Sequence, residues 1–160
     1  METVEAKVEN DKDRLKIDFE LRRDRPAHTG LTIALRPEAT SAVSVSPVWI
    51  SENAFGFLEP RVQRRCSQYG KLSHWGVTRV CREEWFAVIE DWQRLVCELE
   101  RAETPGEYNQ LVWFFSEEAK LDFSDHFDQL KADLSVLINK LHEWIHSTLA
   151  THQCILIEGI

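Results

Sequence analysis

The sequence predicts an α+β domain: a mostly antiparallel sheet, formed by the N-terminal half and one C-terminal strand, packed against two long helices. Apolar residues recur at three- and four-residue steps over about residues 82–103 and again over about 125–149. This spacing is typical of a helix that buries one stripe of its surface. Apolar and polar residues alternate in the N-terminal half, and that period is typical of half-buried strands.

Length and composition predict a single domain spanning residues 1–160. The 160 residues are 43% hydrophobic and 29% charged, which is ordinary for a globular protein with a real core. No apolar run approaches the roughly 18 residues of a membrane span, and the acidic N-terminus lacks the apolar segment of a secretory signal. We therefore expect a cytoplasmic protein, with its four cysteines, none in a C-x-x-C pair, as reduced thiols.

Four strands are expected in the N-terminal half. Residues 3–9 and 14–22 alternate between apolar and polar side chains and predict a hairpin. A third strand is expected around residues 31–35 and a fourth around 43–50. Pro47 places the fourth strand at a sheet edge or a bulge, because proline cannot donate to a ladder of hydrogen bonds.

The remaining segments are expected to form shorter elements and connections. We expect residues 51–58 to be irregular, 60–68 to form a short helix, and 71–80 to form a loop. Residues 107–123 fit a helix or a hairpin, and their aromatic and branched side chains favour the hairpin. The continuous apolar run at residues 154–157 predicts a strand buried on both faces that joins the N-terminal sheet.

The last predicted helix, expected to begin after Ser124, contains a match to a zinc-protease pattern. His142, Glu143 and His146 fit H-E-x-x-H, in which two histidines bind zinc and the glutamate acts as general base, and His152 follows at the spacing of a third ligand. Leu149 replaces the glycine of the metzincin turn, and no methionine follows to form a Met-turn. We expect no catalytic residue and no cofactor, with a zinc hydrolase as the alternative.

Charge favours a protein partner. The net charge of -8 disfavours nucleic-acid binding, which needs Lys and Arg to neutralise phosphates. The one basic cluster, Arg61, Arg64 and Arg65, is predicted to be a solvated helix face. The acidic run could be a solvated rim, and the loop around Trp75-Gly76 could be anchored on the core. Alternatively, both could form a docking surface for a partner. The residues of that docking surface would be Glu117, Glu118, Asp122, Asp125, Asp128, His74 and Trp75.

Three segments resemble bacterial toxin-immunity proteins of contact-dependent inhibition and related polymorphic toxin systems. They are Tyr-Gly-Lys-Leu-Ser-His-Trp-Gly at residues 69–76, Glu84-Trp85, and Ile-Leu-Ile-Glu-Gly-Ile at residues 155–160. The resemblance implies a cytoplasmic binder that blocks a cognate toxin, here a basic nuclease domain that meets the acidic surface. The absence of a long apolar run and the net charge of -8 lead us to expect no membrane partner and no direct nucleic-acid binding. A non-catalytic subunit or regulatory module of a larger complex remains a further alternative.

Overall fold

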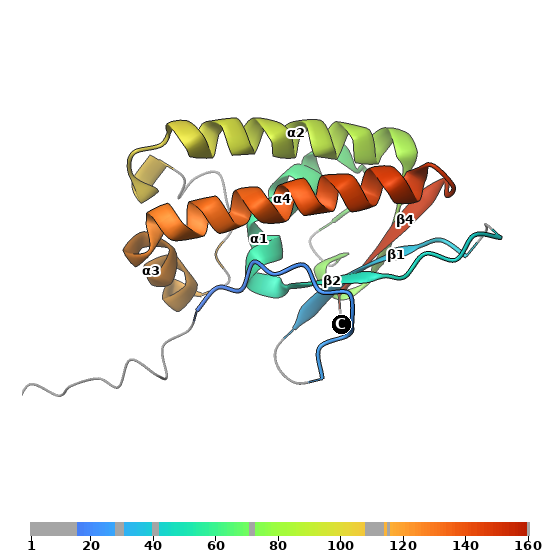
Figure 1. The fold of residues 1–160 in the computed structure, drawn as a ribbon, viewed down its shortest axis with the longest axis horizontal. Helices are drawn as coiled ribbons and strands as arrows, with labels where there is room; N and C mark the ends of the chain where they lie inside the picture. The colour runs from blue at the N-terminus through green and yellow to red at the C-terminus, as the bar shows by residue number, and fades with distance from the viewer. Residues whose placement is uncertain are drawn as a thin grey trace, which may run out of the picture.

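The protein has the predicted α+β fold, with one antiparallel sheet and helices packed on it (Figure 1). The computed structural model describes residues 16–27, 31–39, 42–70, 73–107, 114 and 116–159. The strands are β1 (Thr32–Pro37), β2 (Val48–Ser51), β3 (Val77–Cys81) and β4 (Cys154–Gly159). The helices are α1 (Glu52–Arg65), α2 (Arg82–Arg101), α3 (Glu117–Asp125) and α4 (Phe127–Leu149), with short 3-10 turns η1 (Ser73–Trp75) and η2 (Pro105–Glu107).

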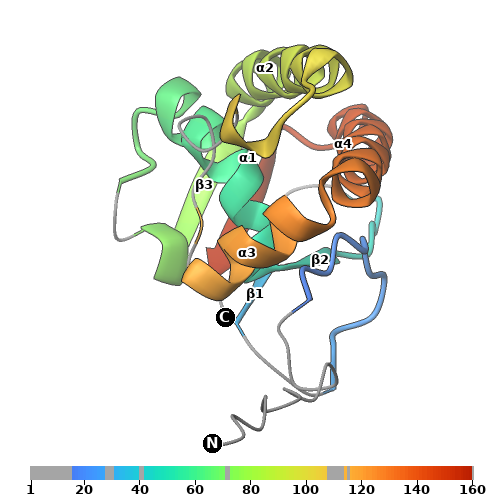
Figure 2. The same ribbon diagram turned by 90° about the vertical axis from the view of Figure 1, so that its left-hand side faces the viewer.

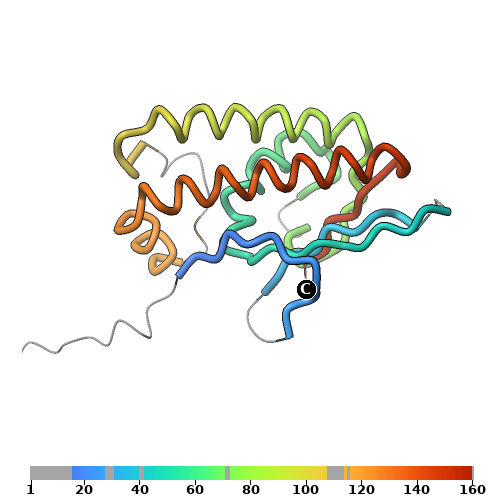
Figure 3. Tube along the Cα trace, in the orientation of Figure 1, coloured from blue at the N-terminus to red at the C-terminus, as the bar shows by residue number. Residues whose placement is uncertain are grey.

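The sheet has the order β2-β1-β4-β3, and each neighbouring pair is antiparallel. Figure 3 follows the chain from the end of α4 into β4, which returns to the middle of the sheet. Helices α2 and α4 pack side by side, and α1 lies between α2 and the sheet (Figure 2). The core between these layers is apolar, and the side chains of Trp85, Trp92, Leu134 and Leu137 are fully buried in it.

The predictions of both long helices and of three strands are confirmed. The predicted helix at 82–103 is α2, and the predicted strands at 31–35 and 43–50 overlap β1 and β2. Pro47 directly precedes β2, which is an edge strand as expected. The strand predicted at 154–157 is β4, and it joins the N-terminal sheet through β1. No helix in the described part of the chain has the length and hydrophobicity that a membrane crossing needs.

The predicted strand at residues 14–22 is wrong for the part that the structure describes. Ile17 and Phe19 are buried, as the alternation indicates, but the segment joins no sheet apart from one bridge at Arg22. The amide of Ile17 donates to the Asp122 carboxylate (2.8 Å). Its partner strand, predicted N-terminal to residue 10, lies outside the described residues.

The prediction of an irregular stretch at residues 51–58 is also wrong, because this stretch is the first half of α1. Ser51 is the N-cap, and its hydroxyl accepts from the amide of Ala54 (3.2 Å). Pro60 lies inside the helix, not at its start. Burial of apolar side chains holds this half of α1 against the sheet and offsets the cost of an internal proline. The buried residues are Ala54, Phe55, Phe57 and Leu58.

Residues 71–80 were expected to form a loop, but they contain most of β3. This strand occupies the sheet edge next to β4. Thr78 and Val80 face the core, whereas Val77 and Arg79 are exposed. Four residues of alternation beside a glycine are too short a pattern to separate a strand from a loop, so pairing with β4 decided the conformation.

Residues 117–123 form helix α3, so the hairpin favoured for this region is wrong there; residues 108–113 lie outside the described part of the chain. Ser116 caps the helix by accepting from the amide of Ala119 (3.1 Å). Ser124, predicted to cap the last helix, instead donates to the carbonyl of Lys120 (2.9 Å) within α3. Helix α4 begins at Phe127 after a break at His126.

The expectation of four reduced thiols is wrong in this structure, because Cys81 and Cys154 form a disulfide. The two residues lie opposite each other in the β3–β4 ladder, with Cα atoms 4.1 Å apart. They are 73 residues apart in the sequence, so only the sheet register brings them together. Cys66 and Cys97 remain free thiols.

A Gly159→Ala substitution is expected to lower the free energy of unfolding by about 1–3 kcal/mol through overpacking. An added Cβ would lie 2.7 Å from the carbonyl carbon of His74 and 2.9 Å from the Cα of Trp75, and still closer to the His74 oxygen. Backbone atoms cannot move aside as a flexible side chain can. Gly106→Ala is the control, since nothing lies within 4 Å of its added Cβ. The free energies of unfolding of both variants would be measured in urea. Equal values would contradict the close packing of the backbone at Gly159 against that of His74 and Trp75.

Candidate partner-binding surface

The acidic run gathers on the outer side of α3 and the first turn of α4, at one end of the molecule (Figure 1). Leu121, with 53% of its surface exposed, lies in the middle of this run. Glu118, Leu121 and Asp125 follow one another at three- and four-residue steps, so they share one face of the helix. Glu117 and Asp128 are exposed beside them. We call these five residues the acidic surface.

Asp122, predicted to belong to this surface, is buried and cannot contact a partner. Its carboxylate accepts from the amide of Ile17 (2.8 Å). The other carboxylate oxygen lies 3.0 Å from Nδ1 of His126. Asp122 therefore fixes the N-terminal segment and the α3–α4 corner. Its position on the inner face of α3 follows from a helical period that a hairpin would not have.

His74, also predicted to contact a partner, is only 4% exposed. Its Nδ1 lies 2.9 Å from a carboxylate oxygen of Glu59, and its Nε2 lies 2.7 Å from one of Glu52. Both carboxylates belong to α1, so the ring ties η1 to that helix. This arrangement is a buried polar group that positions the chain.

Tyr69 completes the group, because its hydroxyl donates to the same Glu59 oxygen. Burial, and then the neighbouring Glu59 carboxylate, raises the pKa of the Tyr69 hydroxyl above its ordinary value. The hydroxyl therefore stays protonated and remains a donor at every physiological pH. Oε1 of the buried Glu59 carboxylate thus contacts both the Tyr69 hydroxyl and Nδ1 of His74.

Trp75, the neighbour of His74, is 60% exposed and remains available for contact. Val77, two residues further along, is exposed as well. Helix η1 packs mainly against β4 and β3, whereas α3 packs mainly against α4 and η2. The structure therefore divides the predicted docking residues between two parts of the fold.

The H-E-x-x-H residues lie on two sides of α4. His142 accepts a hydrogen bond from the Gln93 side-chain amide (3.2 Å), and the His146 ring packs on Phe86 (centroids 5.5 Å apart), so both histidines face α2. Their two rings are 5.7 Å apart. Glu143 instead lines a cleft on the other side of the helix.

His152 is buried at the end of the turn that follows α4. Its Nδ1 lies 3.2 Å from the carbonyl oxygen of Thr148 and 2.9 Å from the hydroxyl of Thr151. The contacts of Nδ1, the ring nitrogen nearest to the backbone, are therefore made within the turn itself. In the part of the chain that the structure describes, no three His, Cys, Asp or Glu side chains converge in a way that could hold a metal ion.

The predicted solvated face is confirmed for Arg64 and Arg65, which are exposed, and wrong for Arg61, which is buried; all three also pair with acidic residues of α2. Arg65 binds the buried Asp91 carboxylate through two hydrogen bonds of 2.8 Å, and Arg64 lies 3.5 Å from the same group. These hydrogen bonds from Arg65 hold the pKa of Asp91 below its usual range. Arg61 is buried and pairs with Glu98 (3.5 Å).

Comparisons with known proteins do not assign a family to the chain. No protein-family model matches it, and neither a curated protein nor a solved structure does. The residue that sequence reasoning missed at the acidic surface is Leu121. The helical spacing of Glu118, Leu121 and Asp125 was the available signal, and the preference for a hairpin hid it.

Proposed function

We propose that this protein is an immunity protein that binds a cognate bacterial toxin through the acidic surface and keeps the toxin inactive. The observation that carries the proposal is an exposed leucine, Leu121, ringed by four exposed carboxylates on α3 and the start of α4. An apolar anchor enclosed by a polar rim is the usual energetic plan of a protein–protein contact.

Charge indicates the kind of partner. The net charge of -8 and the carboxylates around Leu121 favour a basic surface, as in the substrate cleft of a nuclease toxin. Asp128 pairs with Lys131 (3.3 Å) in the next turn, so it contributes less free charge than Glu117 and Glu118 do. The proposed compartment is the cytoplasm, where such a toxin acts on nucleic acid.

A Leu121→Arg substitution is expected to weaken toxin binding at least about thirtyfold, the loss typical of an interface centre. Each variant would be co-expressed with the toxin domains encoded beside its gene, and growth rescue and Kd would be measured. Val136→Arg is the matched control: Val136 is 51% exposed but lies on α4, away from α3. Equal loss in both variants would show that the acidic surface is not the contact.

Reversing the charge of Glu117 and Glu118 together tests the rim separately. Glu117→Lys/Glu118→Lys is expected to slow association about tenfold at low salt and to flatten its salt dependence, since rim charges act on encounter. The control pair is Glu100→Lys/Glu103→Lys, which changes exposed acids at the end of α2 and beyond it. If the wild type rescues no toxin and binds none, the immunity function itself is wrong, whatever the variants do.

The zinc-hydrolase alternative stays a prediction. It is tested by the metal content of the protein purified without chelator, alongside His142→Ala and His146→Ala. One zinc per chain that both variants lose would overturn the proposal in favour of a hydrolase. The third alternative, a subunit of a larger complex, would be favoured by co-purification with a stable partner that is not a toxin.

A further inference from the structure

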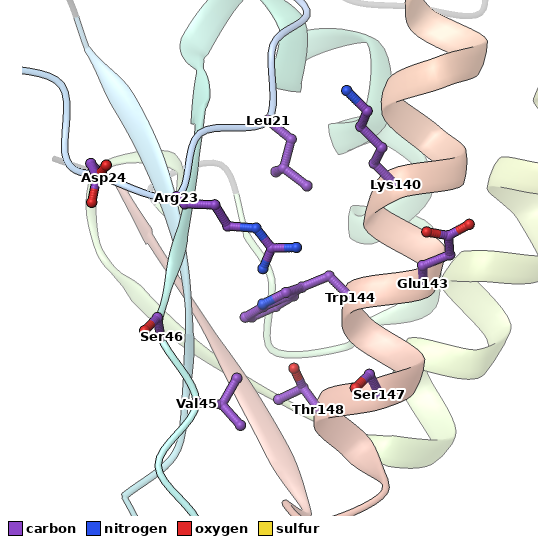
Figure 4. A pocket seen from close by; sticks show the side chains of 10 residues that line it. All are labelled: Leu21, Arg23, Asp24, Val45, Ser46, Lys140, Glu143, Trp144, Ser147 and Thr148. Atoms are coloured by element: carbon purple, nitrogen blue, oxygen red, sulfur yellow. The ribbon is translucent and has the colours of Figure 1, made fainter.

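We infer that a second site, a cleft beside the C-terminal half of α4, binds a small organic carboxylate with an apolar body. The cleft has a volume of about 770 Å³, within the usual range of small-molecule sites. Its walls are the segments at residues 21–24 and 45–46 on one side and α4 from Lys140 to Thr148 on the other (Figure 4). The acidic surface lies at the opposite end of α4, so the two sites are independent.

Two buried polar groups in the cleft wall have no hydrogen-bond partner among the described residues. They are the indole N–H of Trp144, which is 5% exposed, and the hydroxyl of Thr148, which is 1% exposed. A buried donor without an acceptor costs free energy, so such groups are rare in folded proteins. Both side chains reach from α4 into the space between the helix and the segments at residues 21–24 and 45–46 (Figure 4). An acceptor-rich ligand would satisfy them.

The charge in the middle of the cleft is positive. The Arg23 guanidinium points into the cleft toward Trp144, whereas the Asp24 and Glu143 carboxylates point away from its middle (Figure 4). Arg23 makes no ion pair with any described residue, and the same holds for Lys140 at the rim. A guanidinium beside an indole N–H matches the two oxygens of a carboxylate, which it can bind through paired hydrogen bonds.

The apolar part of the cleft defines the rest of the ligand. Leu21 and Val45 are half-buried, pack against the core and line the same cleft as Trp144. A ligand body that displaces these two side chains would reach the covered N–H and hydroxyl groups. A short alkyl chain attached to a carboxylate therefore fits better than a compact, fully hydrated anion such as phosphate.

The test is a titration of ¹⁵N-labelled full-length protein with hexanoate, hexanamide and inorganic phosphate. The readout is the indole N–H resonance of Trp144, assigned among the six tryptophans with a Trp144→Phe variant. Hexanoate is expected to shift this resonance to saturation. Hexanamide should bind at least tenfold more weakly because it lacks the charge, and phosphate should leave the resonance in place.

An Arg23→Gln variant is expected to weaken hexanoate binding at least tenfold, since it removes the cation from an exposed position without disturbing the core. Arg101→Gln, at the far end of α2, is the matched control and should bind as the wild type does. Absence of a saturable shift with hexanoate would overturn the site. Phosphate binding in its place, or hexanoate binding that survives Arg23→Gln, would overturn the assigned chemistry.

Discussion

Replacing His74 with alanine is expected to lower the free energy of unfolding by about 1–3 kcal/mol, the usual cost of leaving a buried polar group without its hydrogen-bond partner. The ring lies between Glu52 and Glu59, and Glu59 is only 2% exposed. Without the ring, Oε1 of Glu59 keeps its hydrogen bond from the Tyr69 hydroxyl but loses its contact with Nδ1 of His74. The η1 turn also loses its side-chain connection to α1.

Urea unfolding of three variants tests this expectation. His146→Ala is the control, because His146 is exposed and its loss should cost little. A double mutant with Glu59→Gln gives the coupling energy between the two side chains, which is typically about 0.5–3 kcal/mol for residues in contact. A loss below about 1 kcal/mol in the single His74 variant would contradict the role given to this buried polar group.

Breaking the Cys81–Cys154 disulfide is expected to cost about 4 kcal/mol. The bond closes a loop of 73 residues, and in the chain-entropy account a long loop restricts the unfolded state strongly. A Cys81→Ala/Cys154→Ala variant should therefore unfold at a lower urea concentration, and a dithiol reductant should have the same effect on the wild type. Cys97→Ala, at an exposed free cysteine, is the control and should leave stability unchanged.

Counting thiols tests whether the disulfide forms in the compartment where the protein resides. In the folded state Cys97 should react with an alkylating reagent, whereas burial raises the pKa of the Cys66 thiol to about 12 and suppresses its reaction. Protein alkylated during rapid denaturation of cells should carry two labels if the disulfide is present. Four labels would show reduced cysteines, as the sequence alone predicted for a cytoplasmic protein.

Apolar patterns correctly predicted the segments that bury a long, continuous stripe of side chains. The helical patterns at 82–103 and 125–149 correspond to α2 and α4, and the apolar run at 154–157 corresponds to β4. These segments were predictable because burial of a continuous stripe outweighs local preference. Residues 51–58 and 117–123 were predicted wrongly, because contacts with distant elements decided the conformation of these shorter stretches.

The sequence by itself determined the α+β class, the two long helices, the acidic character and the chemistry available in each segment. Only the tertiary structure decided which polar side chains reach solvent. It buried His74 and Asp122, exposed Leu121, and joined Cys81 to Cys154. The physical reason is that exposure and pairing depend on neighbours that are far away in the chain. A local pattern records the period of a segment but not what packs against it.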